Sequence, residues 1–146
     1  LSRICRFGGH TYVHYSVAQH SVVVADLVRD HGYSTLMQSH GLLHDAHEAM
    51  TGDIVSPLKD LLIGIKPIEL RIDEVIRQAF AIPAISWHDC NVIKTFDKMA
   101  YEIERGSGLT YHDPTFKEAH RKIVPLDAYA AYRLFIEKFN ELIGEI

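Results

Sequence analysis

The stretch Leu-Leu-His-Asp-Ala-His-Glu-Ala, residues 42–49, decides the fold. Apolar residues recur around it at helical intervals, which predicts a helix over residues 34–50 with this stretch in its second half. Because His44, Asp45 and Glu48 are three or four positions apart or adjacent, they share one side of that helix. Burying such groups without partners costs several kcal/mol each, so metal coordination or a polar pocket is the expected compensation.

Four further helices follow from the spacing of apolar residues between glycines and prolines. Ser16 and Gln19 form a capping-box pattern that begins a helix over residues 16–31. One helix begins at Pro67, Asp89 is expected to cap another, and a long one covers residues 126–143. No alternating segment is long enough for a strand. The sequence therefore predicts an all-α fold, an irregular bundle of about five to seven helices.

Two of these helices have apolar faces that we expect to be buried. After Pro67 the expected stripe is Ile68, Ile72, Val75, Ile76 and Ala79. Near the end, the expected core or subunit-interface residues are Tyr129, Tyr132, Phe135, Ile136, Phe139 and Leu142.

Composition limits the class of protein. A chain of 146 residues with 47% hydrophobic content fits a single domain over residues 1–146. Because it opens with Leu1 rather than Met, we expect a leading segment to be missing before it. The net charge of −4 argues against a non-specific partner of nucleic-acid polymers, which usually carries a basic excess.

Cysteine content and hydropathy indicate the compartment. Cys5 and Cys90 are too few for a disulfide framework, and we expect them to be buried thiols in a reducing environment. No apolar run approaches the ~20 residues that span a bilayer, so no membrane partner is expected. These features predict a soluble protein of the cytoplasm.

Two residues outside residues 42–49 complete a candidate metal site with His44 and Asp45. His20 and Asp97 each lie in the middle of a predicted helix among apolar neighbours. Imidazole and carboxylate ligands together suit zinc, manganese, iron or cobalt, and leave coordination positions open for water and substrate. The expected cofactor is therefore a divalent transition metal (Zn, Co or Mn), and a second divalent ion arriving with substrate phosphates stays an alternative.

A His, then His-Asp, then Asp on three successive helical segments resembles the signature of HD-domain phosphohydrolases. The surrounding motifs are Cys-Arg-Phe-Gly-Gly-His at 5–10, Tyr-Ser-Val-Ala-Gln-His-Ser at 15–21, Gly-Asp-Ile at 52–54 and Pro-Leu-Lys at 57–59. With the central stretch they are similar to the branch that holds bacterial 5′-deoxynucleotidases of the YfbR type and the phage dATP triphosphohydrolases called DatZ. The likeness covers most of the chain and is strongest over residues 5–100.

This resemblance implies a role for each motif residue. The implied metal ligands are His20, His44, Asp45 and Asp97. Glu48 and Asp53 would be the acid/base and water-orienting carboxylates, and Arg6 would hold substrate phosphate. Phe7 stands where the nucleotidases carry tryptophan, and its ring can still line a sugar or base. Lys59 and Lys94 offer further cations for phosphate oxygens.

The leading functional hypothesis is hydrolysis of 2′-deoxynucleotides. Removal of triphosphate from a dATP-like dNTP comes first, removal of phosphate from a dNMP is the alternative, and a non-catalytic metal and nucleotide sensor is a third. A metallopeptidase ranks low because the chain has no His-Glu-x-x-His spacing. By the same resemblance we expect a homo-oligomer with a small-molecule substrate, in a bacterial or phage-infected host.

For His10 and His14, in the glycine-bearing entry loop, contact with the substrate stays an open alternative, and the other histidines are expected to carry no chemistry. For His47 we favour a solvent-facing position over a second cation site, and His88 with Asp89 is expected to form a helix start. A polar connection with expected exposure follows Gly108 and contains His112, Asp113 and His120.

Overall fold

The computed structural model describes residues 1–110 and 122–144, so the connection containing His112, Asp113 and His120 lies outside the described residues. Within those ranges the structure is helical, with a single antiparallel bridge between Cys5 and Ser16 and no strand. The elements are η1 (Arg6–Gly9), α1 (Val17–Asp30), α2 (Thr35–Leu43), α3 (Glu48–Thr51), α4 (Ser56–Lys59), α5 (Ile65–Ala79), α6 (Trp87–Gly106) and α7 (Ala128–Leu142). The predicted all-α fold is confirmed.

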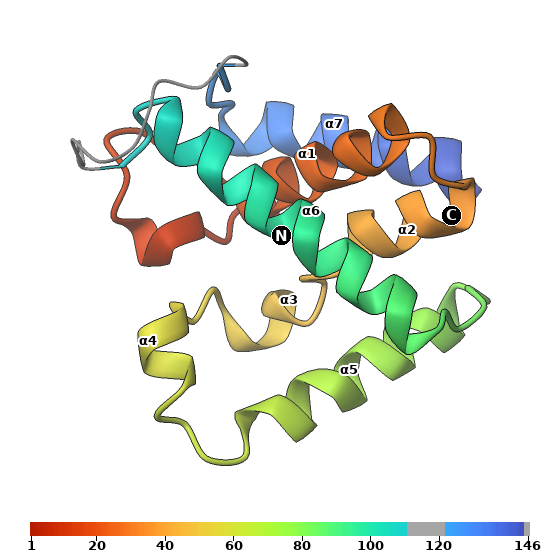
Figure 1. Cartoon of the computed structure of the whole chain (residues 1–146). Coiled ribbons are helices and arrows are strands. Elements are labelled where there is room, and N and C mark those ends of the chain that lie inside the picture. Colours follow the sequence, from red (N-terminus) through yellow and green to blue (C-terminus); the bar gives the residue numbers. More distant parts are fainter. Residues whose placement is uncertain (111–121, 145–146) are drawn as a thin grey trace.

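Helix α1 is the centre of the bundle, packed between α2, α6 and α7 (Figure 1). It begins where the sequence predicts, because the Ser16 side chain accepts a hydrogen bond from the Gln19 N–H. One face of α1 joins α2 and α6 in a core that includes Val24, Val28 and Phe96. Burial of each such side chain contributes about 1.5–3 kcal/mol. His20 is consequently fixed on the most buried helix of the chain.

The predicted helix over residues 34–50 is wrong in its second half. Helix α2 ends at Leu43, residues 44–47 form turns, and α3 starts at Glu48. Hydrogen bonds there run between residues three apart, from Ala46 N to Leu43 O and from Glu48 N to Asp45 O. Such bonds tighten the turn relative to an α-helix and redirect the side chains. His44 and Asp45 therefore lie at a helix end rather than in mid-helix.

Helix α5 lies below the bundle with α4 (Figure 1), and its apolar stripe is only partly covered. Ile68 and Val75 are 54% and 60% exposed, against the expectation of a buried face, whereas Glu69 is the residue of α5 that is buried. The prediction failed because helical spacing identifies a face without saying what packs on it. In helix α7 Phe139 is buried in the core as expected, whereas Tyr129 and Tyr132 are exposed, so for these two the subunit interface stays the prediction.

Helix α6 starts with Ser86 as its cap, not with Asp89 as predicted. The Ser86 hydroxyl accepts a hydrogen bond from the Asp89 N–H and donates one to the Asp89 carboxylate. His88 is exposed in the first turn.

Two further sequence expectations concern the surface and the bilayer. Cys5 and Cys90 are exposed free thiols, which corrects their predicted burial. Among the described residues, none of the helices combines the length and apolar character that crossing a bilayer requires.

Candidate metal centre

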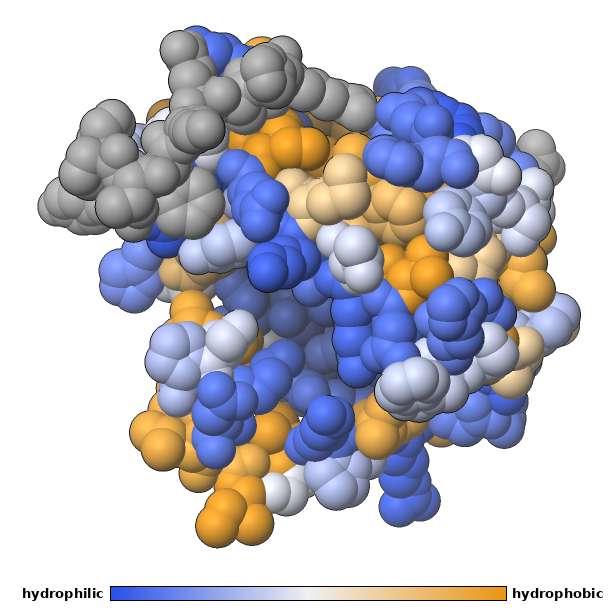
Figure 2. All heavy atoms as spheres, viewed as in Figure 1, coloured by the Kyte–Doolittle hydropathy of each residue, from blue (hydrophilic) through white to orange (hydrophobic). Residues whose placement is uncertain are grey.

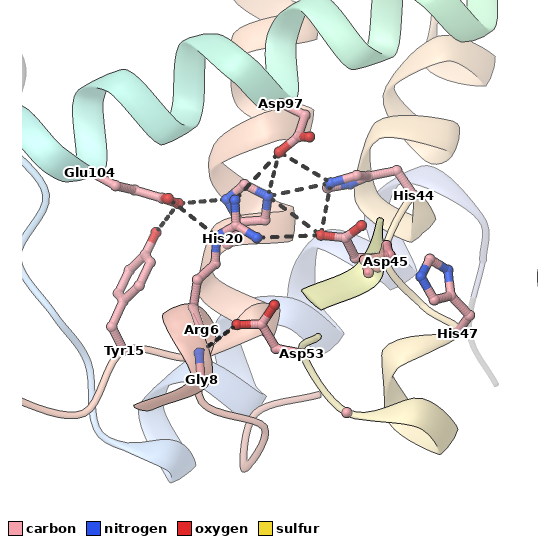
Figure 3. Close-up of polar contacts among 12 residues, drawn as sticks. Arg6, Gly8, Tyr15, His20, His44, Asp45, His47, Asp53, Asp97 and Glu104 are labelled. Atoms are coloured by element: carbon pink, nitrogen blue, oxygen red, sulfur yellow. Dashed lines mark hydrogen bonds and ion pairs between the residues drawn. The ribbon is translucent and has the colours of Figure 1, made fainter. Parts of the chain in front are cut away.

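Two histidines from different helices aim the same ring nitrogen at one point. The Nε2 atoms of His20 and His44 are 3.3 Å apart (Figure 3). His20 Nδ1–H donates to Glu104 Oε1 at 2.5 Å, and His44 Nδ1–H donates to the Gly41 carbonyl oxygen at 2.8 Å. Because both partners can only accept, each ring carries its proton on Nδ1 and leaves the Nε2 lone pair for a cation.

Two carboxylates complete the group around these nitrogens. Asp45 Oδ2 lies 3.1 Å from His44 Nε2 and 3.6 Å from His20 Nε2. Asp97 Oδ1 reaches down from α6 to within 3.1 Å of His20 Nε2 and 3.7 Å of His44 Nε2 (Figure 3). Atoms bound about 2.0–2.2 Å from one cation are separated by roughly 3 to 4 Å. The four predicted ligands are therefore brought together with the spacing that a shared divalent cation needs.

Glu104 organises this group and was missed in the sequence. Its side chain is fully buried on α6, two helical turns after Asp97. It accepts hydrogen bonds from the His20 ring, from the Tyr15 hydroxyl at 2.8 Å and from Arg6 Nε at 3.2 Å. The seven-residue spacing from Asp97, which repeats one face of a helix, was the signal that could have found it.

Arg6 lies against three carboxylates rather than free in a pocket. Its guanidinium is 3.6 Å from Asp45 Oδ2, 3.4 Å from Asp97 Oδ1 and 3.2 Å from Glu104 Oε2. Burial lowers the pKa of Arg6, but the charges of Glu104, Asp45 and Asp97 outweigh that effect and raise it. The backbone holds Arg6 in this position, because the Arg6 backbone N–H donates a hydrogen bond to the Tyr15 carbonyl oxygen beside the Cys5–Ser16 bridge.

The titration of the ligands reflects their proximity. Burial acts against the charged forms, but the neighbouring charges and hydrogen bonds are stronger. The pKa values of Asp45 and Asp97 fall well below the ordinary range because of His44 and His20, and the pKa of His44 rises well above it because of Asp45 and Asp97. Without a cation, His44 is thus held protonated between carboxylates, and cation binding there must release a proton.

The two predicted acid/base carboxylates differ in their surroundings. Glu48 is 3% exposed, and burial followed by the charges of Asp45 and Asp53 raises its pKa to about 8. Asp53 accepts a hydrogen bond from the Gly8 N–H at 2.9 Å, which ties it to the left-handed turn at Phe7 and Gly8. Glu48 can therefore exchange a proton near neutral pH, while Asp53 is fixed at the opening of the site.

A pocket of about 560 Å³, here called the Arg6 pocket, opens on this group. Figure 2 shows a hollow lined by hydrophilic residues between α6 and the α3–α4 segment. Predicted residues that line the pocket are Arg6, Phe7, Asp45, Glu48, Asp53, Lys59 and Asp97. Lys98 and Tyr101, which the sequence analysis did not identify, also line it, and Tyr101 lies beside Phe7 with ring centroids 5.9 Å apart.

Lys94 is the predicted substrate-binding residue that does not line the Arg6 pocket. It lines a second cavity of about 580 Å³, here called the Trp87 pocket, between α2, α5 and α6. The Trp87 pocket is mostly apolar, and His44, Asp45 and Asp97 border it. Lys94 lies one helical turn nearer the start of α6 than Lys98. This shift along the helix axis places Lys94 in the Trp87 pocket and Lys98, next to Asp97, in the Arg6 pocket.

The expectation that His47 faces solvent is wrong. His47 is 6% exposed, its Nδ1–H donates to Asp73 Oδ1 at 2.9 Å, and its Nε2 lies 3.5 Å from Glu69 Oε1. The tight turn at residues 44–47 points this ring at α5.

Comparison with known proteins gives relatives whose descriptions state no activity. No family model matches the chain. It is similar to a protein of Escherichia coli K12, described as uncharacterized protein YfdR, at 36% identity over 151 residues, which cover 97% of this chain and 79% of that protein. A Rhodobacter capsulatus protein, described as uncharacterized protein RCAP_rcc00048, is 35% identical over 92 residues, 58% of this chain and 46% of that protein.

Proposed function

This chain belongs to the family of the Escherichia coli protein YfdR, and we propose that it is a metal-dependent phosphohydrolase of 2′-deoxynucleotides. One observation carries the proposal: the Nε2 atoms of His20 and His44 are 3.3 Å apart and are flanked by Asp45 and Asp97, which line a pocket with cationic side chains. The sequence motifs, which resemble those of HD-domain phosphohydrolases, point to the same chemistry.

The donor set fits a divalent transition metal such as zinc, cobalt or manganese, because both imidazole N–H groups are already satisfied by acceptors. When bound, such a cation supplies Lewis acidity, which makes water a nucleophile near neutral pH and neutralises phosphoryl charge. Arg6 contributes a fixed positive charge at the same wall, where it can receive a phosphate oxygen.

Glu48 and Asp53 have complementary roles in this proposal. Glu48, buried beside Asp45, would in its ionised form accept a proton from the attacking water. Asp53 orients the leaving oxygen from the other side of the Arg6 pocket.

The shape of the site supports a triphosphate as the leading substrate. Asp45 and Asp97 border both the Arg6 pocket and the Trp87 pocket. A dNTP that is attacked at its α-phosphorus carries a nucleoside on one side and a diphosphate on the other, so space on both sides of the metal centre suits it. Lys59 and Lys98 lie in one pocket and Lys94 in the other, which supplies cations along such a substrate.

The second candidate is a 5′-deoxynucleotidase, favoured by the compact Arg6 pocket, whose 560 Å³ accommodates a monophosphate without the second cavity. Incubation of the metal-loaded protein with each dNTP and each dNMP, with product analysis, separates the two. Deoxynucleoside with inorganic triphosphate is the expected result. Phosphate from dNMPs alone would replace the leading proposal by the second.

A non-catalytic metal and nucleotide sensor is the third candidate, and the variant Glu48→Gln tests it. The variant should lose turnover about 100-fold or more, as expected for loss of a general base, while it retains the cation held by His20, His44, Asp45 and Asp97. If neither the wild type nor the variant converts any deoxynucleotide, although both bind metal, the catalytic proposal fails and the sensor remains.

A further inference from the structure

A second group of metal-ligating side chains lies beside the first, at the contact between the turn of residues 44–47 and α5. His47 is the centre of this group, because its Nε2 lies 3.5 Å from Glu69 Oε1 and its Nδ1 lies 2.9 Å from Asp73 Oδ1. Glu48 joins it because His47, Glu48 and Asp45 offer ligand atoms within 4.8 Å of one another. The three candidate ligands His47, Glu48 and Glu69 are more than nine-tenths buried, at 6%, 3% and 7% exposure. His47 Nε2 and Glu48 Oε2 lack a hydrogen-bond partner there, whereas Glu69 Oε1 is met by the Lys59 ammonium at 2.9 Å. Buried polar atoms are rarely left in this state, which points to a missing partner.

The arrangement repeats the geometry of the first site. His20 donates its Nδ1–H to Glu104, and its Nε2 lies 3.6 Å from Asp45 Oδ2. In the same way His47 donates its Nδ1–H to Asp73 at 2.9 Å, and its Nε2 lies 3.5 Å from Glu69 Oε1. A carboxylate that holds the proton of a histidine so that the other nitrogen faces a ligand oxygen is the usual support of a metal-binding imidazole.

We propose that His47, Glu48 and Glu69 form a second divalent-cation site, with Asp73 as the positioning residue that orients His47. Asp45, His47 and Glu48 each offer a ligand atom within 4.8 Å of the others, so the two cations are neighbours. One imidazole and two carboxylates suit manganese, zinc or cobalt. The site also accounts for α5, which buries Glu69 while its apolar residues Ile68 and Val75 are exposed.

Lys59 gives the proposal a distinctive consequence. Its Nζ lies 2.9 Å from Glu69 Oε1, where the ammonium neutralises a carboxylate that the second cation would use. Lys59 also lines the Arg6 pocket, so binding of the cation frees its side chain to turn towards that pocket. The ammonium and the cation compete for the same oxygen, and removal of the ammonium must favour the cation.

The test is the number and affinity of Mn²⁺ ions bound by chelator-stripped protein, measured by calorimetric titration and elemental analysis, with no substrate present. The wild type should bind two ions per chain, Glu69→Gln one, and Asp73→Asn two with the second weakened about 10- to 100-fold. Asp97→Asn, which alters only the first site, should retain the second ion. A wild type that binds a single ion, or a Glu69→Gln chain that still binds two, would overturn the proposal.

Because Glu69→Gln also removes the ion pair with Lys59, Lys59→Met serves as a second variant that keeps all three ligands. It should bind the second Mn²⁺ more tightly than the wild type. Weaker second binding in a folded Lys59→Met chain would contradict the site. Loss of the proposed hydrolase activity would leave these results unchanged, since only metal uptake is measured.

Discussion

Glu104 shows how a single residue can join the metal ligands to the substrate pocket. It receives hydrogen bonds from His20, Tyr15 and Arg6, so one buried carboxylate sets the ring proton of a ligand and the position of a guanidinium. Burial raises its pKa, but the charge of His20, then that of Arg6 and the Tyr15 hydroxyl lower it below the ordinary value. The Glu104 carboxylate is therefore ionised in the folded protein.

Glu104→Gln tests this role. An amide in place of the carboxylate can offer its NH2 group to His20 and removes the charge that holds the Nδ1 proton. We expect the affinity for the first cation to fall about 10- to 100-fold, measured by competition with a chelator. Tyr15→Phe is the matched control, since it removes one hydrogen bond to the same carboxylate and should cost about 1 kcal/mol of stability with little change in affinity. Equal metal affinity in Glu104→Gln and the wild type would contradict the role.

Glu48 predicts a pH dependence of stability in the cation-free chain. Its pKa is about 8 when folded and 4.5 in a model peptide, so between these values the unfolded chain binds fewer protons than the folded one. Stability should fall as pH rises through this window, by at most about 1.4 kcal/mol per pH unit. Chemical denaturation between pH 5 and 8 with chelator should give a flatter profile for Glu48→Gln. Parallel profiles for the two proteins would show that Glu48 is not protonated in the fold.

At the scale of helices, the start of α1 could be predicted from the sequence, whereas the end of α2 could not. Ser16 caps α1 as its sequence pattern indicates, because the cap and its target lie three residues apart. The end of α2 at Leu43 could not be predicted, since no glycine or proline marks it and the apolar spacing continues. What breaks the helix is local bonding in the turn and the contacts of its side chains with α1 and α5, which are tertiary.

Loss of the Ser86 cap should change the stability of α6 without changing the position of the metal ligand Asp97 on the same helix. Ser86→Ala removes the acceptor for the Asp89 N–H and should lower the free energy of unfolding by about 1 kcal/mol. Asp97 lies three turns further along, so metal affinity should not change. Ser86→Asp, which keeps a capping oxygen, is the control and should retain stability. A loss of metal affinity in Ser86→Ala comparable to that of a ligand variant would contradict this separation.

At the scale of the molecule, the all-α bundle could be anticipated from local apolar spacing, and the convergence of His20, His44, Asp45 and Asp97 from the resemblance of their motifs to a known signature. The partners of those residues could not. Glu104 and Lys98 lie on α6 among the residues of an amphipathic helix, and only the packing of α6 on α1 shows which of them face the site. His47 was misplaced for the same reason, because its partners Glu69 and Asp73 come from a helix whose docking the sequence does not encode locally.

The central claim is that two imidazoles and two carboxylates share one divalent cation. Anomalous diffraction from crystals loaded with zinc or cobalt tests it most directly. A peak is expected about 2.0–2.2 Å from the Nε2 atoms of both His20 and His44 and from oxygens of Asp45 and Asp97. Loaded crystals in which no peak lies between those two nitrogens, or in which either ring faces away from the bound ion, would contradict it.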